Sequence, residues 1–318
     1  MMKRMIPLNL LLGLSILATG NAAAQTEALQ EYSLPGMNVT ALGYEKSNLE
    51  TPADVTVYSG EELKKTGAND VANALKYKAG VYFTQMGPHD QSFITGNSTL
   101  SLRGIKGGTL VLINGVPASF NNVSHLDMMN LDTVEKVEVV KGGGAVLYGS
   151  EAYGGVINVI TKSEYKNSLH IAAGNKGQRD YSATISAGKL GVTLGRNEMG
   201  ETGILTQKQG TKTINGVRVP YYTGFGDSKK DHLGVSYKFD DKLSFNYMFD
   251  KKKYTIDYLG ADNSKLQHFD YDDREHFAQL HFNDQNGFDA TAYYNERIIR
   301  NPDYYHIPIP VRSCLRSP

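Results

Sequence analysis

From Ser168 onward, apolar and polar residues alternate along most of the chain. A period of two is typical of β-strands that bury one face and keep the other polar, and it excludes helices over the same residues. Seven strands are predicted, over residues 169–173, 181–187, 190–194, 233–239, 243–249, 278–282 and 288–294. This half of the chain is therefore expected to form an antiparallel sheet.

The connections between these strands alternate between tight and long. Tight turns are predicted at 188–189, 240–241 and 284–287, and long polar connections at 198–229 and 251–273, with a shorter one at 175–179. Transmembrane β-barrels place short turns on the periplasmic side and longer loops outside. A soluble β-sandwich also alternates, but the loop asymmetry and the Tyr and Phe residues at strand ends favour the barrel.

Composition excludes several other classes of protein. A mean hydropathy of -0.37 excludes a polytopic helical membrane protein, which needs repeated apolar runs of ~20 residues. The 33 basic residues equal the 33 acidic ones without a basic block, which argues against a nucleic-acid partner. One cysteine excludes an intramolecular disulfide and a zinc site built on several thiolates. No acid, base and nucleophile converge in a catalytic motif, so no enzyme activity is expected.

The first 24 residues have the layout of a secretory signal peptide. Lys3 and Arg4 form a positive start, an apolar stretch covers residues 6–17, and three alanines at 22–24 precede Gln25. A buried helix or a retained anchor is the alternative. Without this segment the chain carries 31 basic and 33 acidic residues, a net charge of −2. The protein is therefore expected to be exported.

After the signal, residues 25–49 form a polar arm that Pro35-Gly36 interrupts, and residues 50–163 mix short helices with short strands. Ser59 to Glu62 matches a capping box, and Asn69-Asp70 precedes a second helical stretch. Asn114-Gly115 is the strongest short-range hairpin signal. We therefore predict a compact α+β domain over 50–163, followed by the start of the strand-rich region over 164–305.

Two segments of this α+β domain resemble the plug of TonB-dependent outer-membrane receptors. The first runs from Leu100 to Pro117 and the second from Val134 to Thr161. The motif residues that carry the resemblance are Arg103, Gly104, Asn114, Gly115, Glu138, Gly149, Gly154 and Gly155. The triple glycine at 142–144, where the family often carries Pro or Ser, implies only a local change in one turn.

The resemblance implies a plug enclosed by a 22-stranded barrel in the cell outer membrane, of which about seven strands are visible here. It also implies uptake of a scarce nutrient such as a ferric siderophore, haem or cobalamin, driven by TonB pulling on the N-terminal arm. The expected partners are therefore TonB, outer-membrane lipid and a metal chelate or cobalamin. An outer-membrane adhesin or a small-barrel binding protein without transport is the alternative, although neither needs a plug.

Two sets of residues are candidates for these contacts. The arm segment that resembles a TonB box, and that is suited to strand addition, consists of Met37, Asn38, Val39, Thr40 and Ala41. A plain linker is the alternative for that segment. Ligand contacts are expected from two polar loops at positions resembling the family's plug apices, through Gln85, Met86, His89, Asp90, Gln91, Phe120, Asn121 and Asn122.

No cofactor or metal site is expected. The eight histidines are scattered, and the glycines at 142–144 lack the Gly-Lys-Ser/Thr ending of a phosphate loop. His89 and His125 lie in the two apical loops, where they would reach haem iron only if those loops meet, and surface loop histidines without a ligand role are the commoner case.

The length and the last residues do not match a complete receptor of this family. Only 155 residues follow residue 163, whereas 22 strands of ~9–11 residues need roughly 220. Residues 306–318 contain three prolines and the single cysteine, and are expected to be an aberrant tail from a frameshift, an early stop or a truncated gene model. A natural short receptor is the alternative. The chain is therefore expected to be a fragment that does not transport.

Overall fold

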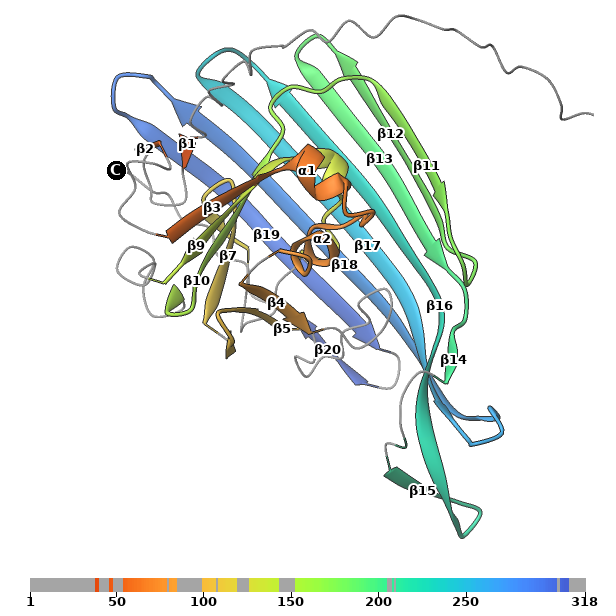
Figure 1. Ribbon diagram of the computed structural model, residues 1–318. Coiled ribbons are helices and arrows are strands. Elements are labelled where there is room, and N and C mark those ends of the chain that lie inside the picture. The colour runs from red at the N-terminus through yellow and green to blue at the C-terminus, as the bar shows by residue number, and fades with distance from the viewer. Residues whose placement is uncertain are drawn as a thin grey trace, which may run out of the picture. The chain divides into compact units, whose positions relative to one another are not determined.

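The structure is a computed structural model that describes residues 38–39, 46–47, 54–78, 80–84, 99–106, 108–118, 126–142, 152–204, 208, 210–301 and 304–308. The expected class is confirmed: an α+β domain precedes antiparallel strands that form one large open sheet (Figure 1). We call the described residues of 54–161 the plug, and the sheet of strands β11 to β20 the wall. In the described part of the chain, no helix is long and apolar enough to cross a membrane.

The plug contains two short helices, a 3-10 turn and two small sheets. The five-stranded sheet has the order β3-β9-β10-β7-β8, in which β10 and β7 are parallel, and the three-stranded sheet has the order β4-β5-β6. The elements are β3 (Asp54–Ser59), α1 (Gly60–Lys64), α2 (Val71–Leu75), β4 (Val81–Thr84), β5 (Thr99–Leu102), β6 (Ile105–Lys106), β7 (Thr109–Ile113), β8 (Val116–Pro117), η1 (Leu131–Thr133), β9 (Val134–Lys141) and β10 (Gly155–Thr161).

The helix starts follow the predicted caps. Ser59 accepts a hydrogen bond from the backbone N–H of Glu62 at 3.1 Å, as the first half of the capping box requires. The Glu62 carboxylate instead pairs with Lys78, so the reciprocal half of the box is not made. Asp70 caps α2 by accepting from the backbone N–H of Asn73 at 2.8 Å. Both helices therefore begin where the short polar side chains satisfy their first N–H groups.

The predicted hairpin also forms. Ile113 pairs with Val116, so Asn114 and Gly115 are the two turn residues between β7 and β8. Their φ angles of 49° and 79° lie in the left-handed region, which Asn and Gly tolerate better than other residues. The turn at Asn114-Gly115 is therefore predicted correctly from the sequence alone.

The wall contains the seven predicted strands, most of them longer than predicted. Its path is β11-β12-β13-β16-β17-β18-β19-β20, with β14 and β15 paired beside β16. The bounds are β11 (Ser168–Ala173), β12 (Arg179–Ala187), β13 (Leu190–Met199), β14 (Gly203–Ile204), β15 (Gly210–Ile214), β16 (Val217–Lys238), β17 (Leu243–Leu259), β18 (Lys265–Asn283), β19 (Asp289–Asn301) and β20 (Tyr304–Pro308).

The sequence prediction was wrong about the two long connections. Most of 217–229 and of 251–273 is strand, because β16, β17 and β18 continue past the apolar series and pair with one another there. The extensions alternate as well, as at Tyr254, Ile256 and Tyr258 of β17, but the charged runs 251–253 and 272–275 separate them from the predicted strands. Residues 306–308, assigned to the tail, lie in β20 at the edge of the wall, a position that tolerates Pro308.

The two faces of the wall differ in chemistry. One face exposes large apolar side chains, among them Leu169, Ile171 and Ile185 with exposed fractions of 74%, 65% and 60%. The other face contacts the plug, and it is polar in its buried part: Ser182, Thr184 and Thr193 lie there. The core lies mainly in the plug, and Met248 and Phe277 of the wall join it.

Candidate functional site

Many of the predicted ligand and arm residues lie outside the described residues. These are Gln85, Met86, His89, Asp90, Gln91, Phe120, Asn121 and Asn122 of the apical loops, Met37, Thr40 and Ala41 of the arm, and Gly149 of the plug motif. Asn38 and Val39 form β1, which pairs with Lys46 and Ser47 of β2. The roles assigned to all of these residues stay predictions.

Three of the motif residues belong to one buried hydrogen-bond network inside the plug. The side-chain oxygen of Asn158 accepts from the backbone N–H of Gly115 at 3.0 Å, and its amide donates to Glu138 at 3.3 Å. Lys136 lies 2.8 Å from the fully buried Glu138 carboxylate. Asn114 donates to Thr161 Oγ1 at 2.9 Å, which ties the hairpin turn to the end of β10. The motif therefore holds β7, β9 and β10 together.

The remaining described motif residues serve the backbone of the plug. Arg103 pairs with Asp54 at 2.7 Å in an exposed position, and Gly104 follows it in the turn between β5 and β6. A Cβ on Gly155 would lie 2.4 Å from the carbonyl oxygen of Val140, and one on Gly154 would lie 2.9 Å from that of Gly108. These two glycines therefore allow a close approach of backbones that no larger residue permits.

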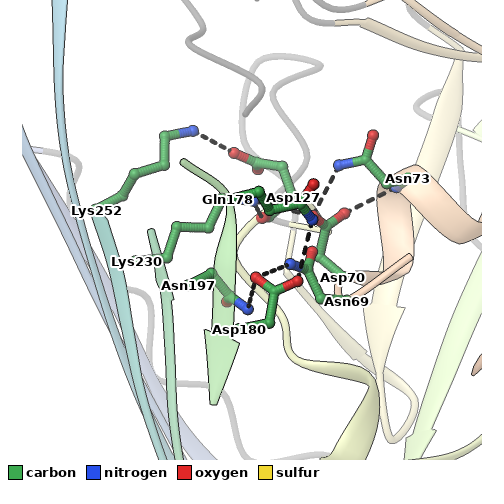
Figure 2. A network of polar contacts seen from close by, with 9 residues as sticks. All are labelled: Asn69, Asp70, Asn73, Asp127, Gln178, Asp180, Asn197, Lys230 and Lys252. Carbon is green, nitrogen blue, oxygen red and sulfur yellow. Dashed lines mark hydrogen bonds and ion pairs between the residues drawn. The ribbon is translucent and has the colours of Figure 1, made fainter. Parts of the chain in front are cut away.

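The strongest candidate site is the contact between the plug and the wall, drawn in Figure 2. Asp70 of the plug accepts a hydrogen bond from Lys230 of β16 at 2.9 Å. Asp127 binds two lysines: its backbone oxygen accepts from Lys230 at 2.7 Å and its carboxylate accepts from Lys252 of β17 at 2.7 Å. All four side chains are at most 7% exposed, so these ion pairs are buried.

The charge of Asp127 depends on this arrangement. Burial by itself would raise the pKa of its carboxyl group, because a buried charge loses its hydration. The nearby positive charges of Lys252, Arg297 and Lys230 outweigh burial and hold the pKa of Asp127 well below its usual range. The plug therefore presents a negative charge to the lysines of the wall.

Neutral amides extend the contact to the next two strands. Asn69 beside the helix cap donates to Asp180 of β12 at 2.9 Å, and Asn197 of β13 donates to the same carboxylate oxygen at 3.0 Å. Gln178 donates to the other oxygen at 3.0 Å. Figure 2 shows these groups beside the two lysines, with side chains from the plug converging on side chains from β12, β13, β16 and β17.

Two further contacts join the plug to the wall. Asp132 of η1 pairs with Lys64 at 2.7 Å and accepts a hydrogen bond from Ser182 of β12. Burial raises the pKa of Asp132, but the hydrogen bonds from Lys64 and Ser182 outweigh it, so that the pKa is lowered. Asn114 donates to Gln279 of β18 at 2.9 Å, which adds a contact far from the first.

Glycines in the wall let the plug approach closely. A Cβ on Gly195 of β13 would lie 2.8 Å from the amide nitrogen of Asn130, and one on Gly234 of β16 would lie 2.8 Å from the Thr133 methyl group. Real Cβ atoms do not approach heavy atoms so closely. Residues 130–133 therefore fit against a part of the wall that lacks side chains at these two positions.

Asp70, Asp127, Lys230 and Lys252 are not among the functional residues predicted from the sequence. A usable signal existed, because ionisable residues stand two apart on the polar face of three strands: Lys230 and His232, Asp250 and Lys252, Asp273 and Glu275. Such pairs on a face that would otherwise be uncharged indicate a charged partner. The described residues contain no group of three or more His, Cys, Asp or Glu side chains arranged to hold a metal ion.

Comparison with known proteins agrees with this architecture. Residues 47–156 match the family model of the TonB-dependent receptor plug domain. The chain is 28% identical over 247 residues to the vitamin B12 transporter BtuB of Vibrio cholerae, covering 72% of this chain and 38% of that protein. It is 33% identical over 214 residues to a hemin receptor of Yersinia enterocolitica, covering 65% and 29%. The chain thus spans less than half the length of these relatives.

Solved structures show the same fold. The ferripyoverdine receptor of the Pseudomonas aeruginosa outer membrane matches with a TM-score of 0.56 and 14% identity, over 88% of this chain and 39% of that one. A ferric enterobactin receptor mutant from the same organism matches with a TM-score of 0.51 and 16% identity, over 79% and 42%. These relatives are named as transporters and receptors, and none is named as an enzyme. The plug, the two-faced wall and these matches together show that the chain belongs to the family of TonB-dependent receptors.

Proposed function

We propose that this chain acts as part of an outer-membrane receptor that takes up a scarce nutrient, such as a ferric siderophore, haem or cobalamin, with energy supplied by TonB. The observation that carries the proposal is the buried pairing of Asp127 with Lys252. It binds a separate α+β domain to the polar face of a sheet whose other face exposes Leu169 and Ile171, as a protein embedded in lipid requires. A plug held in this way blocks the space beside the wall until work displaces it.

The arm supplies the proposed contact with TonB. Asn38 and Val39 are extended and pair with only two residues of β2, so little backbone pairing has to be given up when a partner strand is added. We propose residues 37–41 as this segment and an exported, membrane-inserted location for the whole receptor. The predicted signal peptide over residues 1–24 would direct that export.

The nutrient is proposed to be a ferric siderophore, haem or cobalamin. The relatives named for vitamin B12 and hemin are 28% and 33% identical to this chain, and the structures named for ferric enterobactin and ferripyoverdine share its fold at 16% and 14% identity. Specificity is proposed to lie in the two apical loops, through Gln85, Met86, His89, Asp90, Gln91, Phe120, Asn121 and Asn122. Aromatic and amide side chains of this kind suit an organic chelate.

Uptake by a complete receptor that carries these residues tests the proposal. Cells lacking their own receptors would be offered cobalamin, haemin or a ferric catecholate, with and without functional TonB. We expect uptake of one of the three, lost without TonB and lost in Val39→Pro, which blocks strand addition but leaves ligand binding intact. Unchanged uptake without TonB, or after alanine replacement of all eight loop residues, would contradict the proposal.

Residues 1–318 by themselves are proposed not to transport. Within the described residues the wall is open, with β11 at one edge and β20 at the other. Unpaired backbone groups in hydrocarbon cost several kcal/mol each, which a marginally stable domain does not absorb. Expressed alone, this chain should show no heat-modifiable outer-membrane species and no uptake; the appearance of both would refute this part of the proposal.

A further inference from the structure

Two rows of directly opposite residues cross the buried face of the wall. Row A contains Asp180, Asn197, Lys230, Lys252 and Asp273, on strands β12, β13, β16, β17 and β18. Row B contains Ser182, Gly195, His232, Asp250, Glu275 and Arg297, on the same strands and β19. The ionisable groups of these two rows therefore come from β12, β16, β17, β18 and β19, and His170 of β11 is directly opposite Ser182 at the end of row B.

Lys230 and Lys252 stand directly opposite each other in row A. Like charges at opposite positions of neighbouring strands repel, so a counter-ion is needed close to both. In the seated plug that counter-ion is Asp127, assisted by Asp70. Moving the plug away withdraws both carboxylates at once and leaves the two lysines opposite each other without them.

The wall contains replacement carboxylates at the neighbouring positions. Asp273 is directly opposite Lys252 on the side away from Lys230. Asp250 is one step diagonal from Lys230, within reach of a lysine side chain, and now binds His232 at 2.6 Å. Arg297, which pairs with Asp273 at 3.4 Å, also has Glu275 directly opposite it. Arg297 therefore keeps a carboxylate if Asp273 turns to Lys252.

The number of charges in the two rows also indicates that carboxylates of the wall can replace those of the plug. Rows A and B contain the cations Lys230, Lys252 and Arg297 and the carboxylates Asp180, Asp250, Asp273 and Glu275. Without the plug the two rows already hold enough negative charge for their three cations. The seated plug adds Asp70 and Asp127 to this buried region, so its carboxylates are exchangeable with those of the wall.

We propose that the wall exchanges counter-ions when the plug leaves: Lys252 passes from Asp127 to Asp273, and Lys230 passes to Asp250. The exchange keeps the lysines paired throughout and so lowers the free energy needed to displace the plug. The relevance of the exchange to transport rests on the proposed function, but the exchange itself is a property of the plug and wall and is tested without any nutrient or TonB.

The rate at which a buried thiol of the wall is labelled measures how often the plug leaves. Thr193 of β13 is fully buried on the face that contacts the plug. Thr193→Cys therefore reports opening to a maleimide, in a complete receptor that carries these residues and no other cysteine, held in detergent micelles. Protection of this thiol in the otherwise unaltered chain is the first expected result. A thiol labelled as fast as in unfolded protein would contradict the seated plug and overturn the proposal.

Asp273→Asn is the decisive variant. With Asp127 present, it should slow labelling about tenfold, because the open state loses the carboxylate that receives Lys252. In an Asp127→Asn background it should instead accelerate labelling about tenfold, because Asp273 is then the carboxylate directly opposite Lys252 that can balance its charge in the seated state. Asp272→Asn, whose carboxylate pairs with Arg274 at 2.9 Å, is the matched control and should leave the rate unchanged.

The opposite effects of Asp273→Asn on the labelling rate, with and without Asp127, distinguish the exchange from simpler explanations. If Asp273 only repels Asp127, its replacement slows labelling in the first background and has no effect in the second. If Asp273 only supports Arg297, its replacement accelerates labelling in both. Either pattern, or no effect in either background, overturns the proposal. If Asp273→Asn has these opposite effects on labelling but the receptor takes up none of the proposed nutrients, the proposed function is contradicted and the exchange still stands.

Discussion

Lys252→Met should release the plug from the wall. The substitution removes the ammonium group 2.7 Å from Asp127 and keeps an unbranched side chain in its place. The Lys252 and Asp127 side chains are 0% and 4% exposed, so a buried carboxylate is left behind. Removing one partner of a buried pair costs about 3–5 kcal/mol. The effect should be near 3 kcal/mol, about 150-fold in the ratio of open to seated plug, because Arg297 and Lys230 remain near Asp127.

The stability of the seated plug should respond to pH in opposite directions in the unaltered protein and in Lys252→Met. In the unaltered protein the pKa of Asp127 is lowered, so its charge stabilises the seated plug at pH values above the unfolded pKa of about 4, and the stabilisation is lost as pH falls through the lowered value. In Lys252→Met, burial should raise that pKa. A raised carboxyl pKa favours the folded state as pH falls, so acidification from pH 7 to pH 5 should restore part of the lost stability only in the variant.

The assay is the same thiol-labelling measurement at position 193, made at both pH values. Lys251→Met is the matched control, since Lys251 is partly exposed and lies 4.0 Å from Asp272, and it should change the open-to-seated ratio by less than about 0.5 kcal/mol. Lys252→Met with Asp127→Asn should recover most of the loss, because no charge is then left buried without its main partner. An effect no larger than the control's, or a double variant as open as the single one, would refute the reasoning.

Three further outcomes are expected. Ser59→Ala removes the N-cap of α1 and should lower the stability of the plug by about 1 kcal/mol in urea titrations, whereas Ser59→Asp should not. Gly234→Val places a side chain where the Thr133 methyl group lies, so it should weaken plug seating by about 1–3 kcal/mol and raise thiol labelling accordingly; unchanged labelling would show that this close contact does not form. Asp132 has a lowered pKa, so the seated plug should lose stability as pH falls below about 4, and Asp132→Asn should flatten that part of the profile.

The sequence by itself determined the local features and the division of the chain. Alternation revealed the seven wall strands, because a strand that separates lipid or core from a polar face must change chemistry at every residue. Ser59, Asp70 and Asn114-Gly115 were read correctly, since a cap or a turn depends on only a few neighbouring residues. The plug motif identified the family for the same reason: its residues follow one another at short spacing.

Only the tertiary structure decided which polar residues of the wall meet the plug. Lys230 and Asp70 are 160 residues apart, and Lys252 and Asp127 are 125 apart, so no local pattern links them. The extensions of β16, β17 and β18 were missed because charged runs interrupt the apolar alternation, whereas backbone pairing between the strands continues through those runs. From sequence alone, a lysine in an alternating strand is expected to be solvated. The register of the sheet places Lys230 opposite Lys252, and only the tertiary structure brings the plug carboxylate that makes their burial stable.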